Sequence, residues 1–172
     1  MSSRIVLVRH GETEANRNYR FAESDDVPLT DLGRQQALEL ALRIREQFQP
    51  QRLYTSCFAR ARETGAIIGY ELGLEPSILD GVHERDFGCL RGKSYKEALE
   101  TMHGERWLWT PEGGENLEQV QARVIAALRT IREPEAIVVS HGAVMESISA
   151  WVTGNWETAA IPSNCDIAVV EL

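Results

Sequence analysis

The sequence has few of the features that mark secreted, disulfide-bonded or membrane-spanning proteins. Its three cysteines, Cys57, Cys89 and Cys165, lie far apart and form no C-x-x-C pair, so a disulfide framework and a zinc knuckle are both disfavoured. No apolar stretch approaches the ~18 residues that a membrane-spanning helix needs. The first residues lack the apolar core and small-residue cleavage site of a signal peptide. We therefore expect a reduced, soluble, cytoplasmic protein.

Positive charge is also scarce. The chain has 18 lysines and arginines against 26 aspartates and glutamates, which gives a net charge of −8. An acidic surface disfavours nucleic acids and anionic membranes as partners, although a local group of arginines can still bind a small anion. The length of 172 residues and the hydrophobic fraction of 43% are ordinary for a globular protein. We expect one domain over residues 1–172, as a monomer or a homodimer.

Hydrophobic periodicity predicts strands that alternate with helices. Short apolar, β-branched runs predict strands at residues 5–9, 52–55, 77–79, 136–139 and 167–172. Apolar residues at helical spacing predict helices at residues 30–48, 59–72, 95–107, 117–132 and 143–151. This alternation is typical of an α/β fold, a three-layer α/β/α sandwich with a mostly parallel central sheet. Ligands of such sheets bind at the carboxyl ends of the strands.

Two of the predicted strands end in nearly the same residues. The first runs into Arg9-His10-Gly11 and the strand at 136–139 into Ser140-His141-Gly142, so two of the four histidines should emerge at one edge of the sheet. Glycine in these positions lets the backbone approach a ligand closely. The N-termini of the helices that follow offer N–H groups to an anion.

Arginines are expected at the same edge. Arg9 precedes His10, and Arg60 follows the second predicted strand. Cationic groups gathered in one place are unfavourable unless an anion neutralises them, and the guanidinium fork matches phosphate oxygens. Nearby arginines also lower the pKa of a histidine and keep its nitrogen neutral and nucleophilic. These residues predict a phosphate site.

Six ordered elements of the chain resemble motifs of the histidine phosphatase superfamily, which includes cofactor-dependent phosphoglycerate mutases and many small phosphatases. They are Arg9-His10-Gly11-Glu12-Thr13 with Asn16 and Arg20; Asp26-x-Pro28-Leu29-Thr30 with Gly33 and Gln36-Ala37; Ser56-x-x-x-Arg60-Ala61-x-Glu63-Thr64; Glu84-Arg85-Asp86-Phe87-Gly88 with Gly92; Gly113-Gly114-Glu115-Asn116 with Arg123; and Ser140-His141-Gly142. The resemblance runs nearly from end to end and implies a phosphoglycerate mutase-like fold.

The resemblance also implies catalytic roles. His10 would be the nucleophile that becomes phosphohistidine, and Glu84 the general acid and base. The residues that would hold the phosphoryl oxygens are Arg9, Asn16, Arg60, His141 and Gly142. Asp86 is a rival for the acid, because residues two apart on an extended segment point the same way and spacing alone does not separate them. The resemblance favours Glu84.

Residues 93–112 are expected to form a short lid-like insertion over the substrate. Lys93, Lys96 and Arg106 are candidates to meet a second anion there. Trp107 and Trp109 would face roughly opposite sides of a helix, so both cannot join one core. One of them is a candidate to cover the pocket, and a role in anchoring a loop is an equally good interpretation. The candidate substrate contacts are Thr13, Arg20, Trp107 and Ala143.

Several charged residues near these motifs have structural interpretations. His10-Gly11-Glu12 is similar to the H-x-E of zinc deaminases, but the P-C-x-x-C that accompanies it is absent, so neither a metal nor another cofactor is expected. Glu12 is expected to orient its neighbours through hydrogen bonds, and Thr13 and Asp26 to cap local structure. Arg123, in the middle of a predicted helix, is expected on a solvated face.

The favoured function is hydrolysis of a phosphate monoester of a small metabolite. The short 93–112 span holds no Arg-Arg pair, and Ala143 stands where family mutases present asparagine. Both departures favour a phosphatase over a mutase. The alternatives left open are mutase-type phosphoryl transfer, a protein phosphohistidine or phosphotyrosine phosphatase, and a phospho-ligand-binding domain without activity.

Overall fold

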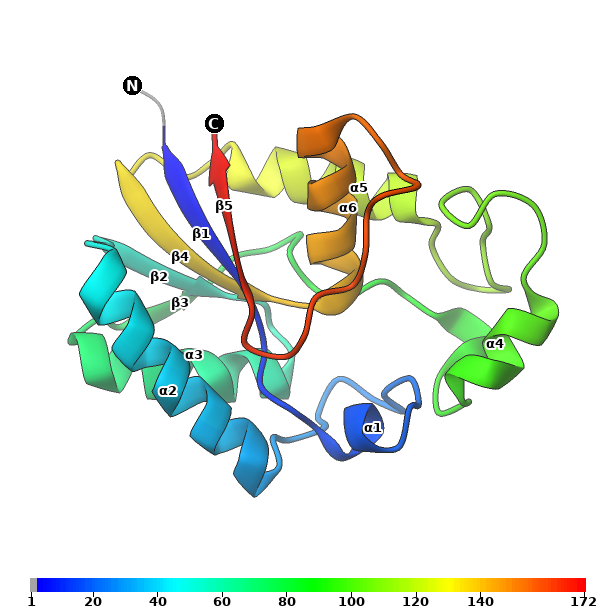
Figure 1. Ribbon diagram of the computed structural model, residues 1–172, viewed down its shortest axis with the longest axis horizontal. Helices are drawn as coiled ribbons and strands as arrows, with labels where there is room; N and C mark the ends of the chain where they lie inside the picture. The colour runs from blue at the N-terminus through cyan, green and yellow to red at the C-terminus, as the bar shows by residue number, and fades with distance from the viewer. Residues whose placement is uncertain (1–2) are drawn as a thin grey trace.

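The computed structural model describes residues 3–172, which build a five-stranded sheet with helices on both faces (Figure 1). The strands are β1 (Arg4–Arg9), β2 (Arg52–Thr55), β3 (Pro76–Ile78), β4 (Glu135–Ser140) and β5 (Ile167–Glu171). Their order across the sheet is β3-β2-β4-β1-β5. All neighbouring pairs are parallel except β1 with β5, which are antiparallel. The predicted mostly parallel α/β sheet is confirmed.

The helices follow the predicted order, with shifted ends. They are α1 (Glu14–Arg17), α2 (Asp31–Gln47), α3 (Ala59–Leu72), α4 (Tyr95–Thr101), α5 (Leu117–Leu128) and α6 (Gly142–Thr153), with a short 3₁₀ turn at Gly88–Leu90. α4 ends six residues before the predicted end at 107, because the chain turns at Gly104, whose φ is +70°. Four-residue α1 was not predicted, since it is too short to carry a periodic pattern. None of the helices within residues 3–172 has the length and apolar character needed to cross a bilayer.

Alternate residues of the central strands divide the interior into two cores. In β1, Ile5 and Leu7 pack with α5 and α6, whereas Val6 and Val8 pack with α2 and α3. All four side chains are fully buried. A strand covered on both faces reads as a continuous apolar run, which is why residues 5–8 show no alternation in the sequence. The two helix pairs and the sheet form the three predicted layers (Figure 1).

The register of the sheet brings the motif-bearing strand ends together. Arg9 lies opposite Ser140 in the β1–β4 pair, and Thr55 lies opposite Val139 in the β2–β4 pair. The residues that follow these three strands therefore meet at one edge. α1 and α4 lie beyond that edge, away from the four long helices (Figure 1).

Candidate active site

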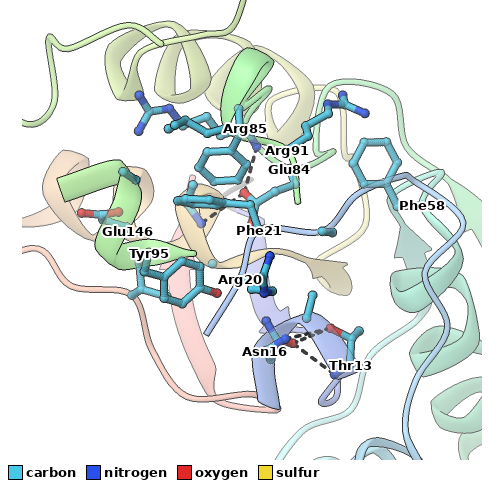
Figure 2. Close-up of a pocket in the computed structure, with 18 of the residues that line it drawn as sticks. Thr13, Asn16, Arg20, Phe21, Phe58, Glu84, Arg85, Arg91, Tyr95 and Glu146 are labelled. Atoms are coloured by element: carbon cyan, nitrogen blue, oxygen red, sulfur yellow. Dashed lines mark hydrogen bonds between the residues drawn. The ribbon is translucent and has the colours of Figure 1, made fainter. Parts of the chain in front are cut away.

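A cavity of about 400 Å³ opens at the carboxyl ends of β1, β2 and β4 (Figure 2). Its sheet end is lined by predicted site residues, namely Arg9, His10, Thr13, Asn16, Arg60, Glu84, Gly142 and Ala143. These residues come from four separate parts of the chain, and the cavity lies where an α/β sheet is expected to bind its ligand.

His10, directly after β1, is held as a neutral imidazole with one free ring nitrogen. Its side chain is buried, and Nδ1 lies 2.7 Å from the carbonyl oxygen of Gly11. A carbonyl oxygen only accepts, so Nδ1 carries the proton and Nε2 keeps its lone pair. Burial lowers the pKa of His10 well below 6.5, and the charges of Arg60 and Arg9 lower it further. The sequence predicted the direction of this shift from the arginines, but burial is the larger cause.

His141 is buried at the end of β4, and its ring centroid lies 5.2 Å from that of His10. Its Nε2 is 2.6 Å from Oγ of Ser56. The same Oγ accepts from the backbone N–H of Phe58, and within residues 3–172 Nε2 is the one acceptor that the structure offers to the serine proton, so we assign the hydroxyl as the donor to Nε2. Nδ1 of His141 then carries the ring proton. Burial first, and then the charge of Arg60, lowers the pKa of His141 well below 6.5.

Unpartnered polar atoms are concentrated around His10. Among the side chains of residues 3–172, four buried polar atoms have no hydrogen-bond partner: Arg9 Nε, Arg60 Nη1, His141 Nδ1 and Glu146 Oε1, the last of which faces Arg106 in an ion pair. The first three are donors near His10: Arg9 and Arg60 line the sheet end of the cavity, and His141, which does not line it, lies beside the ring of His10. Because buried donors are normally satisfied, three of them in one place indicate a site for a ligand rich in acceptors. A phosphoryl group, with three equatorial oxygens, meets that need.

Asn16 is oriented as a further donor. Its Oδ1 accepts hydrogen bonds from the backbone N–H and the hydroxyl of Thr13, as the dashed lines in Figure 2 show. Nδ2 of Asn164 donates to the same oxygen at 3.2 Å and to the carbonyl of His10 at 2.9 Å. The amide nitrogen of Asn16 is therefore available to the cavity. Thr13 caps α1, as predicted, while Asn164 was missed because it lies in a loop without a motif.

The geometry separates Glu84 from Asp86. Glu84 lines the cavity, and its Oε1 accepts hydrogen bonds from the backbone N–H groups of Arg85 and Ala143. Asp86 lies outside the lining and accepts instead from the N–H of Gly88. The segment is a loop rather than a strand, so the two side chains diverge.

Arg123 holds that loop in place. From α5 it donates to the carbonyls of Gly81, His83 and Glu84, and it forms an ion pair with Glu115. The predicted solvated face was wrong for this residue. Its place among the motif residues was the only available sign, since periodicity along a helix says nothing about a loop that packs across it.

Gly11 owes its identity to packing rather than to a ligand. A Cβ at this position would lie 2.3 Å from the carbonyl oxygen of Gly33 in α2, which is closer than atoms can approach. The expected close approach of Gly11 to a ligand is thus corrected to a close approach of two backbones. Glu12, as predicted, orients its neighbours: its carboxylate binds Thr30 and Arg17.

Two expectations for residues 93–112 are corrected. Trp107 packs on Trp156, with ring centroids 6.2 Å apart, and does not line the cavity, whereas Trp109 does. Lys93 and Lys96 are also outside the lining. Arg106 does reach the cavity, but it is paired with Glu146, a buried carboxylate of α6. The one clue to Glu146 in the sequence was that it is the single charged residue of an otherwise largely apolar predicted helix.

Metal ligands are not gathered at this site. Across residues 3–172 there is no group of three or more histidine, cysteine, aspartate or glutamate side chains placed to hold a metal ion.

Comparison with known proteins gives a consistent result. The model of the histidine phosphatase superfamily (branch 1) matches residues 5–172. A metal-independent phosphoserine phosphatase of Arabidopsis thaliana is 31% identical over 98% of this chain and 76% of its own length. A 2,3-bisphosphoglycerate-dependent phosphoglycerate mutase of Parvibaculum lavamentivorans is 30% identical over 86% of this chain and 79% of its own length.

Solved structures show the same architecture. A mycobacterial glucosyl-3-phosphoglycerate phosphatase in complex with VO3 has a TM-score of 0.85 at 26% identity and covers 97% of this chain and 92% of its own. YhfR of Bacillus stearothermophilus has a TM-score of 0.86 at 27% identity over 99% of this chain and 91% of its own.

Proposed function

The chain belongs to the histidine phosphatase superfamily (branch 1), and we propose that it hydrolyses phosphate monoesters of small metabolites through a phosphohistidine on His10. One observation carries the proposal. The unpartnered donors Arg9 Nε, Arg60 Nη1 and His141 Nδ1 surround a histidine whose Nε2 lone pair is free. Relatives named as phosphatases of phosphoserine and glucosyl-3-phosphoglycerate support the reaction class.

In the first step, Nε2 of His10 attacks phosphorus. The N–P bond forms as the P–O bond to the alcohol breaks, and Arg9, Arg60 and Nδ1–H of His141 stabilise the charge on the equatorial oxygens. Glu84 gives its proton to the departing alkoxide.

In the second step, Glu84 acts as a base. Its carboxylate takes a proton from a water molecule, whose oxygen attacks the phosphorus of phosphohistidine. The N–P bond breaks, the electron pair returns to Nε2 of His10, and inorganic phosphate leaves. The residue ends the cycle protonated, ready for the next ester.

Hydrolysis is favoured over mutase-type transfer by the residues beyond the phosphate. A mutase must hold a substrate with a second anionic group while the phosphoryl group returns to it. Lys93 and Lys96 lie outside the cavity lining, and Arg106 is paired with Glu146. Because residues 93–112 place no free cation in the cavity lining, the intermediate alcohol has little to retain it, and water completes the reaction.

The test uses p-nitrophenyl phosphate at pH 5 to 8 in the presence of EDTA. The wild type is expected to turn over, and mass spectrometry after an alkaline denaturing quench is expected to find phosphate on His10. His10→Ala is expected to lose on the order of 10⁴-fold in kcat. His103→Ala, at an exposed histidine outside the cavity, is the matched control. Activity that disappears in EDTA, or that survives in His10→Ala, would exclude the phosphohistidine route.

A further inference from the structure

The cavity continues from its sheet end, where we place the phosphate (the phosphate end), into a part lined by apolar side chains and by charged ones, among them Arg20, Arg85, Arg91, Arg106 and Glu146. We name this part the apolar chamber after its apolar residues, which are Phe21, Phe87, Leu90, Tyr95, Leu99, Met102, Trp109, Leu117 and Ile161. Four of the nine are aromatic. An alcohol esterified to a phosphate at His10 would have to lie against this wall, because both parts belong to one cavity.

The aromatic wall is held in place before any ligand arrives. The ring of Phe21 lies 4.1 Å from that of Phe87 and 4.9 Å from that of Tyr95, measured between centroids. Backbone hydrogen bonds join the two segments that carry these rings: Phe21 N–H donates to Lys93, and Tyr95 N–H donates to Tyr19. In Figure 2, Phe21 lies in the middle of the view, with Tyr95 to its left and Phe58 to its right. Because backbone hydrogen bonds hold these segments together, the aromatic wall is preformed.

The charged pair in the chamber does not offer a free cation. Arg106 is paired with Glu146 and also donates to the carbonyls of Trp156 and Ala159. The side chain of Glu146 is nearly inaccessible, with a relative exposure of 2% for the residue. An anionic group entering the chamber would therefore meet a buried carboxylate whose counter-ion is already engaged, which is unfavourable in a water-poor environment.

The other chamber arginines are engaged as well. Arg85 donates to the carbonyls of Glu115 and Trp109, at 2.7 and 2.8 Å. Arg91 forms an ion pair with Asp86. Arg20 donates to a backbone carbonyl from an exposed position, where water screens its charge. Of these arginines, Arg91 and Arg106 are neutralised by carboxylates. Arg85 and Arg20 keep their charge, but carbonyl groups engage their N–H donors.

We propose, resting on the function above, that the preferred substrates are phosphate monoesters of uncharged alcohols with an apolar group the size of one or two aromatic rings. The apolar chamber binds that group, and the Glu146–Arg106 pair disfavours esters that carry a carboxylate. A cavity of about 400 Å³ lies in the range of sites that enclose ligands of this size. The preference differs from the phosphoserine and phosphoglycerate chemistry in the names of the relatives.

The test compares alkyl esters whose leaving groups are chemically similar. Benzyl phosphate and 2-naphthylmethyl phosphate represent the apolar class, and glycerol 3-phosphate, phosphoserine and 3-phosphoglycerate represent the polar and anionic classes. All five release a primary alcohol, so a difference in kcat/KM reports on binding rather than on leaving-group reactivity. We expect kcat/KM for the naphthylmethyl ester to exceed that for each of the three polar and anionic esters at least about tenfold, mainly through a lower KM.

A substitution on the wall provides the second arm. Leu99 lies in the chamber on exposed α4, so Leu99→Asn alters the surface without opening a core. It is expected to lower the ratio of kcat/KM for 2-naphthylmethyl phosphate over glycerol 3-phosphate about fivefold. Leu108→Asn is the matched control: Leu108 is also exposed and in the 93–112 segment, but outside the cavity lining, and its ratio should not change.

The outcomes separate this inference from the function on which it rests. If no ester is hydrolysed and His10 carries no phosphate, the proposed function itself fails. If His10-dependent hydrolysis is equal for all five esters, or fastest for phosphoserine or 3-phosphoglycerate, only the chamber inference is overturned. Equal ratios in Leu99→Asn and Leu108→Asn would also overturn it.

Discussion

The two ends of the cavity are built in opposite ways. At the phosphate end, side chains project from the ends of buried strands, and three of the donors have no partner. In the apolar chamber, the wall comes from loops and α4, and the arginines that reach it are engaged with carbonyls and carboxylates. The unpartnered donors favour binding of a phosphoryl group, whereas the engaged arginines around an apolar wall disfavour a second anionic group on the substrate. We therefore place the proposed chemistry at the strand ends, and the proposed selectivity in the loops, α4 and the start of α5 that form the chamber wall.

Glu84 lies at the border between the two ends of the cavity. Among substitutions that leave the nucleophile in place, one at Glu84 is expected to have the largest effect. Glu84→Gln keeps the shape and the hydrogen bond from Ala143 but cannot give a proton. We expect kcat for benzyl phosphate to fall about 10²–10³-fold. Hydrolysis of p-nitrophenyl phosphate, whose leaving group needs no proton, should fall much less in its first step, measured by burst kinetics. Asp86→Asn is the control; a larger loss there would move the acid two residues along the chain.

The phosphate end should also make stability depend on pH. Burial depresses the pKa of His10 and His141 in the folded protein below the ordinary value near 6.5. Below about pH 6.5 the unfolded chain binds protons that the folded one refuses, so the free energy of unfolding should fall as pH decreases, by up to about 1.4 kcal/mol per unit for each histidine. Urea titrations in phosphate-free buffer between pH 5 and 7 measure this slope.

The variants His10→Asn and His141→Asn remove one of these groups each. Each substitution should make the dependence on pH between 5 and 6.5 shallower than in the wild type. A slope that is the same in all three proteins would mean that neither histidine is held neutral by the fold.

Ser56 is expected to act on the phosphate end indirectly, through its hydrogen bond to His141. Without its hydroxyl, Nε2 of His141 loses its donor and the ring proton is no longer confined to Nδ1. We expect Ser56→Ala to lower kcat about tenfold, the cost of one misoriented donor, with little change in KM. Nitrogen NMR of His141 should show one tautomer in the wild type and a mixture in the variant. Unchanged tautomers with a lowered kcat would assign Ser56 a role in packing alone.

The smallest expected effect belongs to the chamber. Glu146→Gln removes a buried negative charge but keeps an oxygen for Arg106. The kcat/KM for 3-phosphoglycerate should rise about threefold relative to glycerol 3-phosphate, as repulsion of the carboxylate is relieved. No change in this ratio, in a variant whose melting temperature equals that of the wild type, would show that Glu146 has no part in selectivity.

The same contrast explains what the sequence could predict. Strands and their carboxyl ends follow from apolar runs, and the convergence of Arg9, His10, Arg60 and His141 follows from the geometry of parallel strands. The direction of the pKa shift of His10 could also be predicted, though its main cause, burial, depends on tertiary packing.

The loops of the site could not be predicted in the same way. Glu84 and Asp86 are equivalent by spacing, and only the loop conformation held by Arg123 separates them. Trp107 was predicted to contact the substrate, but Trp109 lines the cavity instead. This error has a similar origin, because α4 ends at Thr101 and both tryptophans lie on an irregular segment instead of a helix. Local patterns describe elements, while such segments take their conformation from distant partners.

The position of β1 has a consequence for how the chain acquires its structure. β1 is an interior strand of the sheet, yet both of its neighbours, β4 and β5, come from the last quarter of the sequence. During synthesis, the strand that carries His10 has no partner until residues 135–140 have left the ribosome. Contacts between residues this far apart in the sequence form slowly. Until β4 pairs with it, the apolar β1 stays exposed and is prone to aggregation. Chaperone demand should therefore peak late in translation and fall once β4 has paired.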